Sequence, residues 1–480
     1  MARDRYISPL CGRYSSAEMQ WLFSDDRKFG AEGWRKVWLE LARAEQARGT
    51  LISDEQLAEM RVHLTDPIDY ERAAVLEKQL RHDVVAHASA FGEICPTAKP
   101  IINIGGTSCE TTDNVDLDIM REALRLILSG VVCVVDRLAT FAKQYRELPT
   151  LGSTHYQAAM LVTVGKRACM WAQNFVMDLQ FLEWVLDNFR FRGLKGATGT
   201  QASFLELFDG DHSKVLAAEK QFAEAFGFSE VFTITGQTYP RKVDSRVLSV
   251  LSSIANSAHK MANDIRLLVH DKEMVEPFEE NQRGSFGMPH KKNPMRDERI
   301  CSLARLPMVF ELAAQITEAV QWLERTLDDS AGRRVYIAES FLATDAILKV
   351  VQNVTEGLVV YPQVIERRIN EELPFMAIDK IQIAMVKSGA DRMECSQRLR
   401  DHSMAAGAVV KIEGHPNDLI SRLLGDPYFA PIHKSLFNML NPKDFIGRAP
   451  EQVDQFLEQE VGPVLARYHQ LLGGTAELSV

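Results

Sequence analysis

The 480-residue sequence lacks a long apolar run, an apolar N-terminal leader and a paired cysteine motif. Its longest apolar runs, such as residues 131–135, fall far short of the about 20 residues that span a bilayer. The seven cysteines are scattered and include no C-x-x-C, so neither a structural zinc site nor a disulfide framework is indicated. We therefore expect a cytoplasmic protein with no membrane contact.

An excess of basic charge is also missing. The chain has 55 basic and 65 acidic residues, for a formal charge of −10. Nucleic-acid binders gain affinity by neutralising phosphates, so this balance excludes a general nucleic-acid partner. With 46% hydrophobic and 25% charged residues, the composition is that of a globular protein.

What the sequence does have is helical periodicity on two scales. Apolar residues recur at helical spacing between Gly33 and Gly49, and Ser53 with Gln56 indicates a capping box. Longer stretches with almost no Gly or Pro follow, over residues 113–147, 156–191, 242–270, from 294 onward, and 333–358. Several helices this long indicate a bundle with wide apolar faces.

This pattern predicts an all-α fold with three helical domains. We expect an N-terminal helical domain over residues 1–110, a central long-helix bundle over 111–361 and a C-terminal domain of short helices over 362–480.

Residues 284–294 read Gly-Ser-Phe-Gly-Met-Pro-His-Lys-Lys-Asn-Pro and form the most informative segment. We predict a flexible loop that feeds a helix, with Asn293 as N-cap and Pro294 at the first helical position. Three potential cations beside a helix N-terminus suit a carboxylate or phosphate. A solvated basic turn is the competing interpretation.

This segment resembles the G-S-S-x-M-P-x-K-x-N signature of the fumarase/aspartase superfamily, and the resemblance extends over essentially the whole chain. It narrows to the adenylosuccinate lyase family, in its animal-type branch, through motifs around residues 81–83, 106–108, 154–157, 235–239 and 324–330. Phe286 and Met160 depart from the family pattern, where a serine and a glutamine are usual.

The resemblance implies a C–N lyase that removes a proton beside a carboxylate and protonates the departing nitrogen. By family position Ser285 is the base and His155 the acid. Lys291 and Asn293 hold the charged carboxylate, and Glu298 orients the acid histidine.

Further residues are expected to bind substrate. By family position, Arg13 and Tyr14 meet the nucleotide, His82 lies near the phosphate with Arg81 and Asp83 beside it, and Arg299 faces substrate. Guanidinium forks and neutral donors suit phosphate and carboxylate, which adds Arg325, Ser330, Arg334, Thr107, Ser108, Thr154 and Gln237. Surface pairing of these arginines with Asp328 and Asp329 would look the same in sequence.

The family substrates are adenylosuccinate and the succinylated aminoimidazole carboxamide ribotide (SAICAR), and the products are AMP, AICAR and fumarate. The resemblance implies a homotetramer with composite sites and no metal or organic cofactor; His82 and His87 are five residues apart, which does not suit a helical metal pair. Two alternatives remain: another superfamily lyase such as argininosuccinate lyase, and a non-catalytic structural member.

Overall fold

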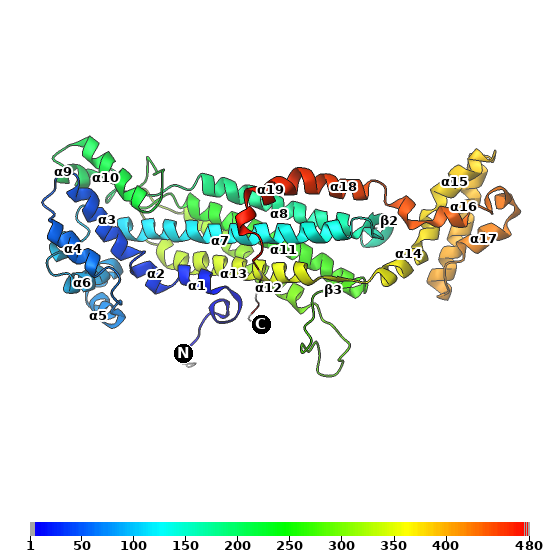
Figure 1. The fold of residues 1–480 in the computed structure, drawn as a ribbon, viewed down its shortest axis with the longest axis horizontal. Coiled ribbons are helices and arrows are strands. Elements are labelled where there is room, and N and C mark those ends of the chain that lie inside the picture. Colours follow the sequence, from blue (N-terminus) through cyan, green and yellow to red (C-terminus); the bar gives the residue numbers. More distant parts are fainter. Residues whose placement is uncertain (1–4, 475, 477, 479–480) are drawn as a thin grey trace.

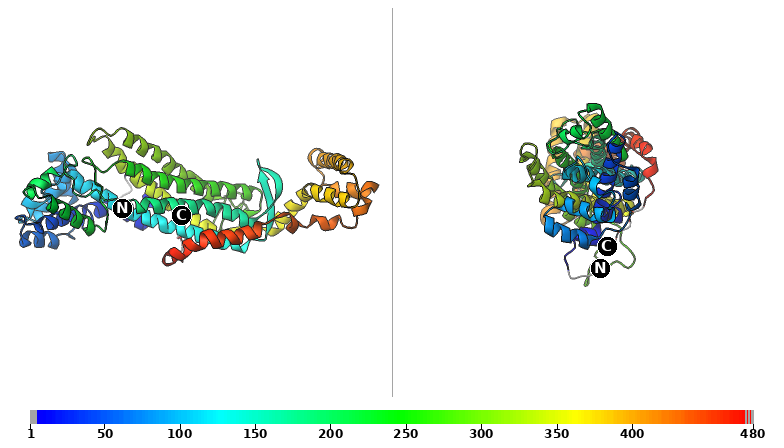
Figure 2. Two further views of the ribbon diagram at one scale, coloured as in Figure 1. Left: turned by 90° about the horizontal axis from the view of Figure 1, so that it is seen from above. Right: turned by 90° about the vertical axis from the view of Figure 1, so that its left-hand side faces the viewer.

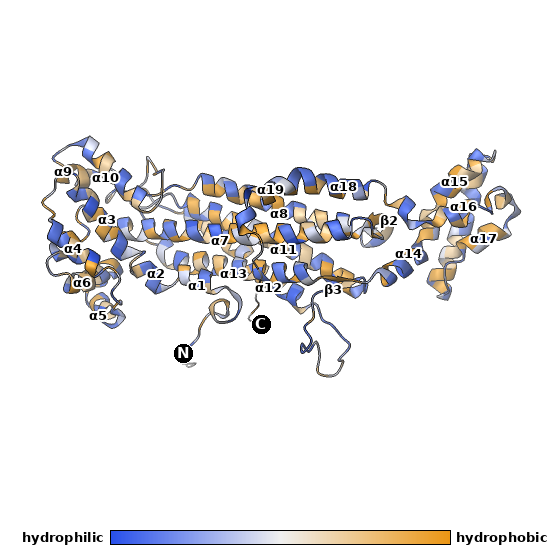
Figure 3. Ribbon diagram, viewed as in Figure 1, coloured by the Kyte–Doolittle hydropathy of each residue, from blue (hydrophilic) through white to orange (hydrophobic). Residues whose placement is uncertain are grey.

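Five long helices form the centre of the molecule in a computed structural model that describes residues 5–474, 476 and 478. They run side by side along the longest axis (Figure 1). Their bounds are α7 Ser108–Gln144, α8 Val164–Asp187, α11 Lys242–His270, α12 Met295–Ala319 and α13 Asp329–Gly357. The all-α prediction is confirmed, and hydrophobic residues alternate with hydrophilic ones along the long helices (Figure 3).

The five long helices pack closely along their length, and α7 and α8 also have side-chain caps at their N-termini. Glu110 accepts the Thr107 N–H at 2.6 Å and so closes the first turn of α7. Gly130 lies where α7 approaches α13, because a Cβ there would come 3.0 Å from Leu348. The core that results includes residues of all five long helices.

One end of the molecule is built from short helices that pack around Trp34 and Trp38, both fully buried. The predicted helix after Gly33 and the Ser53 capping box are both confirmed. α10 packs on α3, so two separate stretches of chain form this end. The bounds are α2 Asp25–Phe29, α3 Trp34–Gln46, α4 Asp54–Val62, α5 Tyr70–Leu80, α6 Asp83–Ile94, α9 Ala202–Leu207 and α10 His212–Ala225, with a short turn at Lys99–Ile101. α1 (Ala17–Leu22) and the turn at Leu10–Tyr14 lie against the bundle instead.

The opposite end holds the C-terminal helices, after which the chain returns along the bundle (Figure 1). The helices of this end are α14 Pro362–Met376, α15 Ile378–Lys387, α16 Arg392–Ala408 and α17 Leu419–Gly425, and those of the returning segment are α18 Ala449–Phe456 and α19 Gly462–Arg467. Short helical turns cover Val409–Glu413, Pro427–Ile432, Phe437–Leu440, Pro442–Phe445, Leu457–Val461 and His469–Leu471. The predicted domain limits at 110 and 361 stay a prediction.

The expected helix over residues 156–191 is wrong in its first part. Antiparallel strands β1 (Pro149–Thr154) and β2 (Gln157–Thr163) form a hairpin, and the helix starts only at Val164. A Cβ on Gly152 would lie 2.5 Å from the Met160 carbonyl oxygen, so the irregular register at this point needs glycine. Pairing between the strands therefore overrides the absence of helix breakers. A second, smaller pair joins β3 (Met274–Val275) to β4 (Val359–Val360).

Candidate active site

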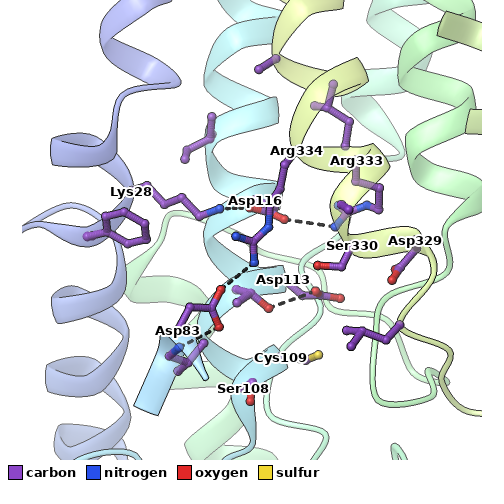
Figure 4. Close-up of a pocket in the computed structure, with 18 of the residues that line it drawn as sticks. Lys28, Asp83, Ser108, Cys109, Asp113, Asp116, Asp329, Ser330, Arg333 and Arg334 are labelled. Atoms are coloured by element: carbon purple, nitrogen blue, oxygen red, sulfur yellow. Dashed lines mark hydrogen bonds and ion pairs between the residues drawn. The ribbon is translucent and has the colours of Figure 1, made fainter. Parts of the chain in front are cut away.

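A cavity of about 940 Å³ lies at the N-terminus of α7, facing the start of α13. Eight of the predicted site residues line it, from four separate stretches of sequence. They are Arg81, His82, Asp83, Ser108, Gln237, Arg325, Ser330 and Arg334. Figure 4 shows this pocket with part of its lining.

His82, which lines the pocket, is held in place by the ends of two helices. Arg81 ends α5 in a left-handed conformation (φ 58°), which turns the chain so that His82 caps α6. The Val85 N–H donates to His82 Nδ1 at 3.4 Å, and His82 Nε2 lies 3.0 Å from Ser108 Oγ. With Nδ1 acting as acceptor, a neutral ring carries its proton on Nε2, beside the Ser108 hydroxyl.

Asp83 and Arg334 point toward one another across the pocket (Figure 4). Arg334 Nη2 donates to Asp83 Oδ2 at 2.6 Å, and the Val84 N–H donates to Oδ1 at 2.8 Å. Burial opposes ionisation of Asp83, but these hydrogen bonds outweigh it and lower the pKa of the carboxyl. Arg334 stays half exposed, so it is also open to an anion in the cavity.

The floor of the pocket is a buried ion network that the sequence analysis missed. Arg241 donates to Asp329 at 2.6 Å and to Asp113 at 3.1 Å, and Arg333 donates to Asp244 at 2.7 Å. The sequence holds no clear signal for it, because Asp113 lies in a polar stretch of α7 (residues 108–114), while Arg241 precedes α11 and Asp329 is the first residue of α13.

Arg325 and Gln237 both line the cavity, but their side chains differ in hydrogen bonding. Arg325 Nη1 is buried, has no hydrogen-bond acceptor among the described residues and lies 3.8 Å from Asp329. Gln237 donates to the Ala197 carbonyl at 3.1 Å. Thr107 does not line the cavity; its hydroxyl bonds to Glu110 at 3.0 Å within the helix cap.

Thr154 and His155 lie at the tip of the β1–β2 hairpin, away from this pocket. His155 and Tyr156 both have positive φ (52° and 57°), as the two-residue turn of a type I′ hairpin requires. Both side chains are exposed, and the hairpin projects from the bundle (Figure 2). Left-handed backbone at two non-glycine residues costs about 1–3 kcal/mol each.

The predicted signature loop hangs from the bundle between β3 and α12 (Figure 1). Ser285 Oγ accepts the Gly287 N–H at 3.4 Å, and Lys291 is exposed. Asn293 does not cap α12 as predicted: its side chain donates to the Gly284 carbonyl at 2.6 Å, and the helix begins at Met295 after Pro294. A Cβ on Gly284 would lie 2.2 Å from the Lys291 carbonyl oxygen, so this closure needs glycine.

Arg13, Tyr14 and Arg299 form a third group beside the start of α12. The guanidinium carbons of Arg13 and Arg299 lie 5.7 and 5.5 Å from the centre of the Tyr14 ring. Glu298, the residue before Arg299, is exposed. The two departures from the family pattern are also exposed, Phe286 fully and Met160 by half, so neither replaces a buried polar contact in this chain.

One chain therefore holds the predicted residues in separate places. Ser108 begins α7, and the hairpin that carries His155 follows the other end of this 37-residue helix. At 1.5 Å per residue the helix is about 55 Å long. Among the described residues, no group of three or more His, Cys, Asp or Glu is arranged to hold a metal ion.

Comparison with known proteins identifies the family. A family model described as lyase matches residues 36–306, and one described as adenylosuccinate lyase C-terminus matches residues 374–456. Adenylosuccinate lyase from Saccharomyces cerevisiae is 50% identical over 98% of this chain and 97% of its own length. The chain belongs to the adenylosuccinate lyase family.

Other comparisons agree with the expected branch and fold. Adenylosuccinate lyase from the animal Schistosoma mansoni is 46% identical over 99% of both chains, whereas that of Pyrococcus abyssi is 28% identical over 93% of this chain and 96% of its own. A 3-carboxy-cis,cis-muconate lactonizing enzyme from Pseudomonas putida shares the fold, with a TM-score of 0.82 at 20% identity over 94% of this chain and 98% of its own. The resemblance found in the sequence is confirmed.

One helix in the described part of the chain, α12, is long and apolar enough to cross a membrane by length and composition. Only 28% of its most apolar window is buried in the single chain. Its exposed apolar side chains follow one face at helical spacing: Val309, Leu312, Ile316 and, directly after the helix, Val320.

Proposed function

We propose that this chain cleaves adenylosuccinate to AMP and fumarate, and SAICAR to AICAR and fumarate. The observation that carries the proposal is the pocket at the start of α7, in a chain of this family. There Arg81, Arg325 and Arg334 offer guanidinium forks to a phosphate, while the His82–Ser108 pair offers neutral donors to a second polar group.

We propose that the complete site forms in a homotetramer. The predicted site residues of one chain lie too far apart to form one site. The pocket, the hairpin tip and the signature loop each hold part of them, and the length of α7 keeps the pocket and the hairpin apart. Closed symmetric assemblies allow such parts to meet from different chains.

The surface of the single chain supports the same proposal. A compact monomer of 54.1 kDa exposes about 18,000 Å². This chain exposes 24,332 Å², an excess of about 6,000 Å² that fits large interfaces between copies. The apolar face of α12 and a stripe on α8 (Met170, Met177 and Trp184) are the surfaces that copies of the chain would cover. Covered in this way, α12 fits a soluble cytoplasmic protein.

The chemistry follows from the residue types. His155 donates a proton to the departing nitrogen, and Ser285 removes the proton beside the carboxylate. A serine hydroxyl is a weak base, so it needs activation by Lys291 and by N–H donors such as that of Gly287. Lys291 and Asn293 stabilise the charge that develops on the carboxylate, while Glu298 orients His155. No step requires a metal or an organic cofactor.

The first experiment measures ultraviolet absorbance of the purified protein with adenylosuccinate and assays fumarate at the end point, with and without prior dialysis against a chelator. We expect stoichiometric AMP and fumarate in both cases. If a folded tetramer gives no reaction, a panel that includes argininosuccinate and SAICAR decides between another lyase activity and a structural role.

The second experiment tests the composite site. His155→Ala and Ser285→Ala are each expected to lower kcat by at least about 100-fold. Mixed assemblies of the two variants should recover about a quarter of native activity, because half of the chains supply each intact residue independently. Near-native turnover in Ser285→Ala would refute its role as base, and an inactive mixture of folded tetramers would refute sharing between chains.

A further inference from the structure

Two acidic side chains close the base of the loop that carries Ser285 and Lys291. Glu276 directly follows β3, where the loop begins, and Asp297 lies in the first turn of α12, where the loop has ended. Both residues are fully buried. The pair therefore connects the two ends of a segment whose middle is exposed.

Backbone hydrogen bonds fix Glu276 in this position. Its carboxylate oxygens accept the Arg296 N–H at 3.1 and 3.0 Å, and one of them accepts the Asp297 N–H at 3.1 Å. The Arg296 side chain adds a second connection, because it donates to the Pro277 carbonyl at 2.9 Å and to Glu279 at 2.7 Å. Both connections join the beginning of the loop to the first turn of α12.

Asp297 has no comparable donors. Neither of its carboxylate oxygens has a hydrogen-bond donor among the described residues. The Glu276 carboxylate lies beside Asp297, because it accepts the Asp297 N–H, and it raises the pKa of the Asp297 carboxyl. Two ionised carboxylates have no proton to place between them, so one of the two must be protonated for the carboxyl groups to lie side by side.

The surroundings decide which carboxyl keeps the proton. Burial raises the pKa of Glu276, and the backbone N–H donors partly offset this effect. Burial and the neighbouring Glu276 raise the pKa of Asp297 well above its ordinary value, against weaker opposing effects of Arg266 on α11 and of Arg296. Cys301, one turn further along α12, is the other titratable neighbour. The charge therefore stays on Glu276 and the proton on Asp297.

We propose that Glu276 and Asp297, sharing one proton, form a positioning device that holds both ends of the signature loop so that Ser285 and Lys291 reach the substrate. The proposal rests on the catalytic role of this loop proposed above. Loss of the shared proton leaves two buried negative charges in contact, which separates the ends of the loop.

The test compares variants that keep or remove the hydrogen-bond donor. Asp297→Asn keeps a donor toward Glu276 without a titrating proton, so kcat should stay within about twofold of native. Asp297→Ala removes the donor, and kcat should fall at least about tenfold because the reacting groups are misplaced. AMP binding to the pocket at the start of α7 should be unchanged in both. Glu280→Ala, which removes an exposed carboxyl from the same loop, is the matched control with native kcat.

The pH profile supplies a readout that a purely structural role would not move. The alkaline limb of kcat should shift to higher pH in Asp297→Asn, because this variant has no proton to lose at position 297. An unchanged limb, native kcat in Asp297→Ala, or an Asp297→Asn enzyme as impaired as Asp297→Ala would each overturn the proposal. If Asp297→Ala does not assemble, the alkaline limb of the kcat profile of Asp297→Asn tests the proposal by itself.

Ser285→Ala separates this proposal from the one on which it rests. If Ser285→Ala keeps near-native turnover, the catalytic role of the loop fails. If Ser285→Ala is inactive and Asp297→Ala is fully active, only the positioning role of the carboxyl pair fails.

Discussion

Replacing Arg241 by methionine tests the buried network beneath the pocket. Arg241 bonds both Asp113 and Asp329, and all three side chains are almost completely buried. Methionine fills much of the volume but leaves two carboxylates without this partner. Removing one member of a buried ion pair typically costs about 3–5 kcal/mol, which we expect for the free energy of unfolding of Arg241→Met near neutral pH.

The loss should depend on pH in a direction that the network fixes. Burial opposes ionisation of Asp113, but Arg241 and Arg333 outweigh it and lower the pKa. In the native protein Asp113 therefore contributes stability that is present above its ordinary pKa and is lost as pH falls. In Arg241→Met burial is less opposed, so the pKa rises, and stability is lost as pH rises from about 4 toward neutral. The deficit of the variant should be smallest in acid.

The assay is urea unfolding, with Tm as a second readout, at a fixed protein concentration and across this pH range. Lys220→Met is the control, because Lys220 and Glu224 form an exposed pair 3.8 Å apart whose loss should cost less than about 1 kcal/mol. Adding Asp113→Asn to Arg241→Met should recover part of the loss. An Arg241→Met deficit below about 1 kcal/mol, or one that is equal at every pH, would refute the reasoning.

Three further predictions concern single positions. Gly284→Ala should lower kcat with little change in Tm, because its Cβ would meet the Lys291 carbonyl at 2.2 Å and open an exposed loop; native kcat would contradict the closure. Tyr156→Gly should raise the free energy of unfolding by about 1 kcal/mol in urea titrations, since glycine adopts positive φ without the Cβ penalty, whereas a loss of stability would show that the ring contributes more. Burial raises the pKa of Glu45 to about 8, so its contribution to stability is lost between about pH 4.5 and 8. Urea unfolding across this range should show that the free energy of unfolding of Glu45→Gln rises relative to that of the native protein as pH rises, by up to about 1.4 kcal/mol per pH unit. A difference that is constant with pH would contradict the shifted pKa.

The helices were predictable where local rules act alone. The capping box at Ser53 and the helix over residues 242–270 depend on nearby side chains and on the absence of Gly and Pro, and the structure has both as predicted. The hairpin at residues 149–163 was not predictable in this way, because strand pairing is a tertiary interaction that periodicity does not record. The predicted N-cap role of Asn293 was wrong for a similar reason. Its side chain donates to the Gly284 carbonyl, nine residues earlier, and helical rules do not record this contact.

The sequence by itself determined the helical class and the family, because motifs and periodicity are local, and it supplied the candidate site residues as predictions. Only the tertiary structure decided which residues meet. It joins His82 to Ser108 and Asp83 to Arg334 in one pocket, and it places His155 at the far end of α7. It also reveals the Arg241 network and the Glu276–Asp297 pair, whose properties follow from burial. Burial depends on how distant segments pack, and no spacing along the chain encodes it.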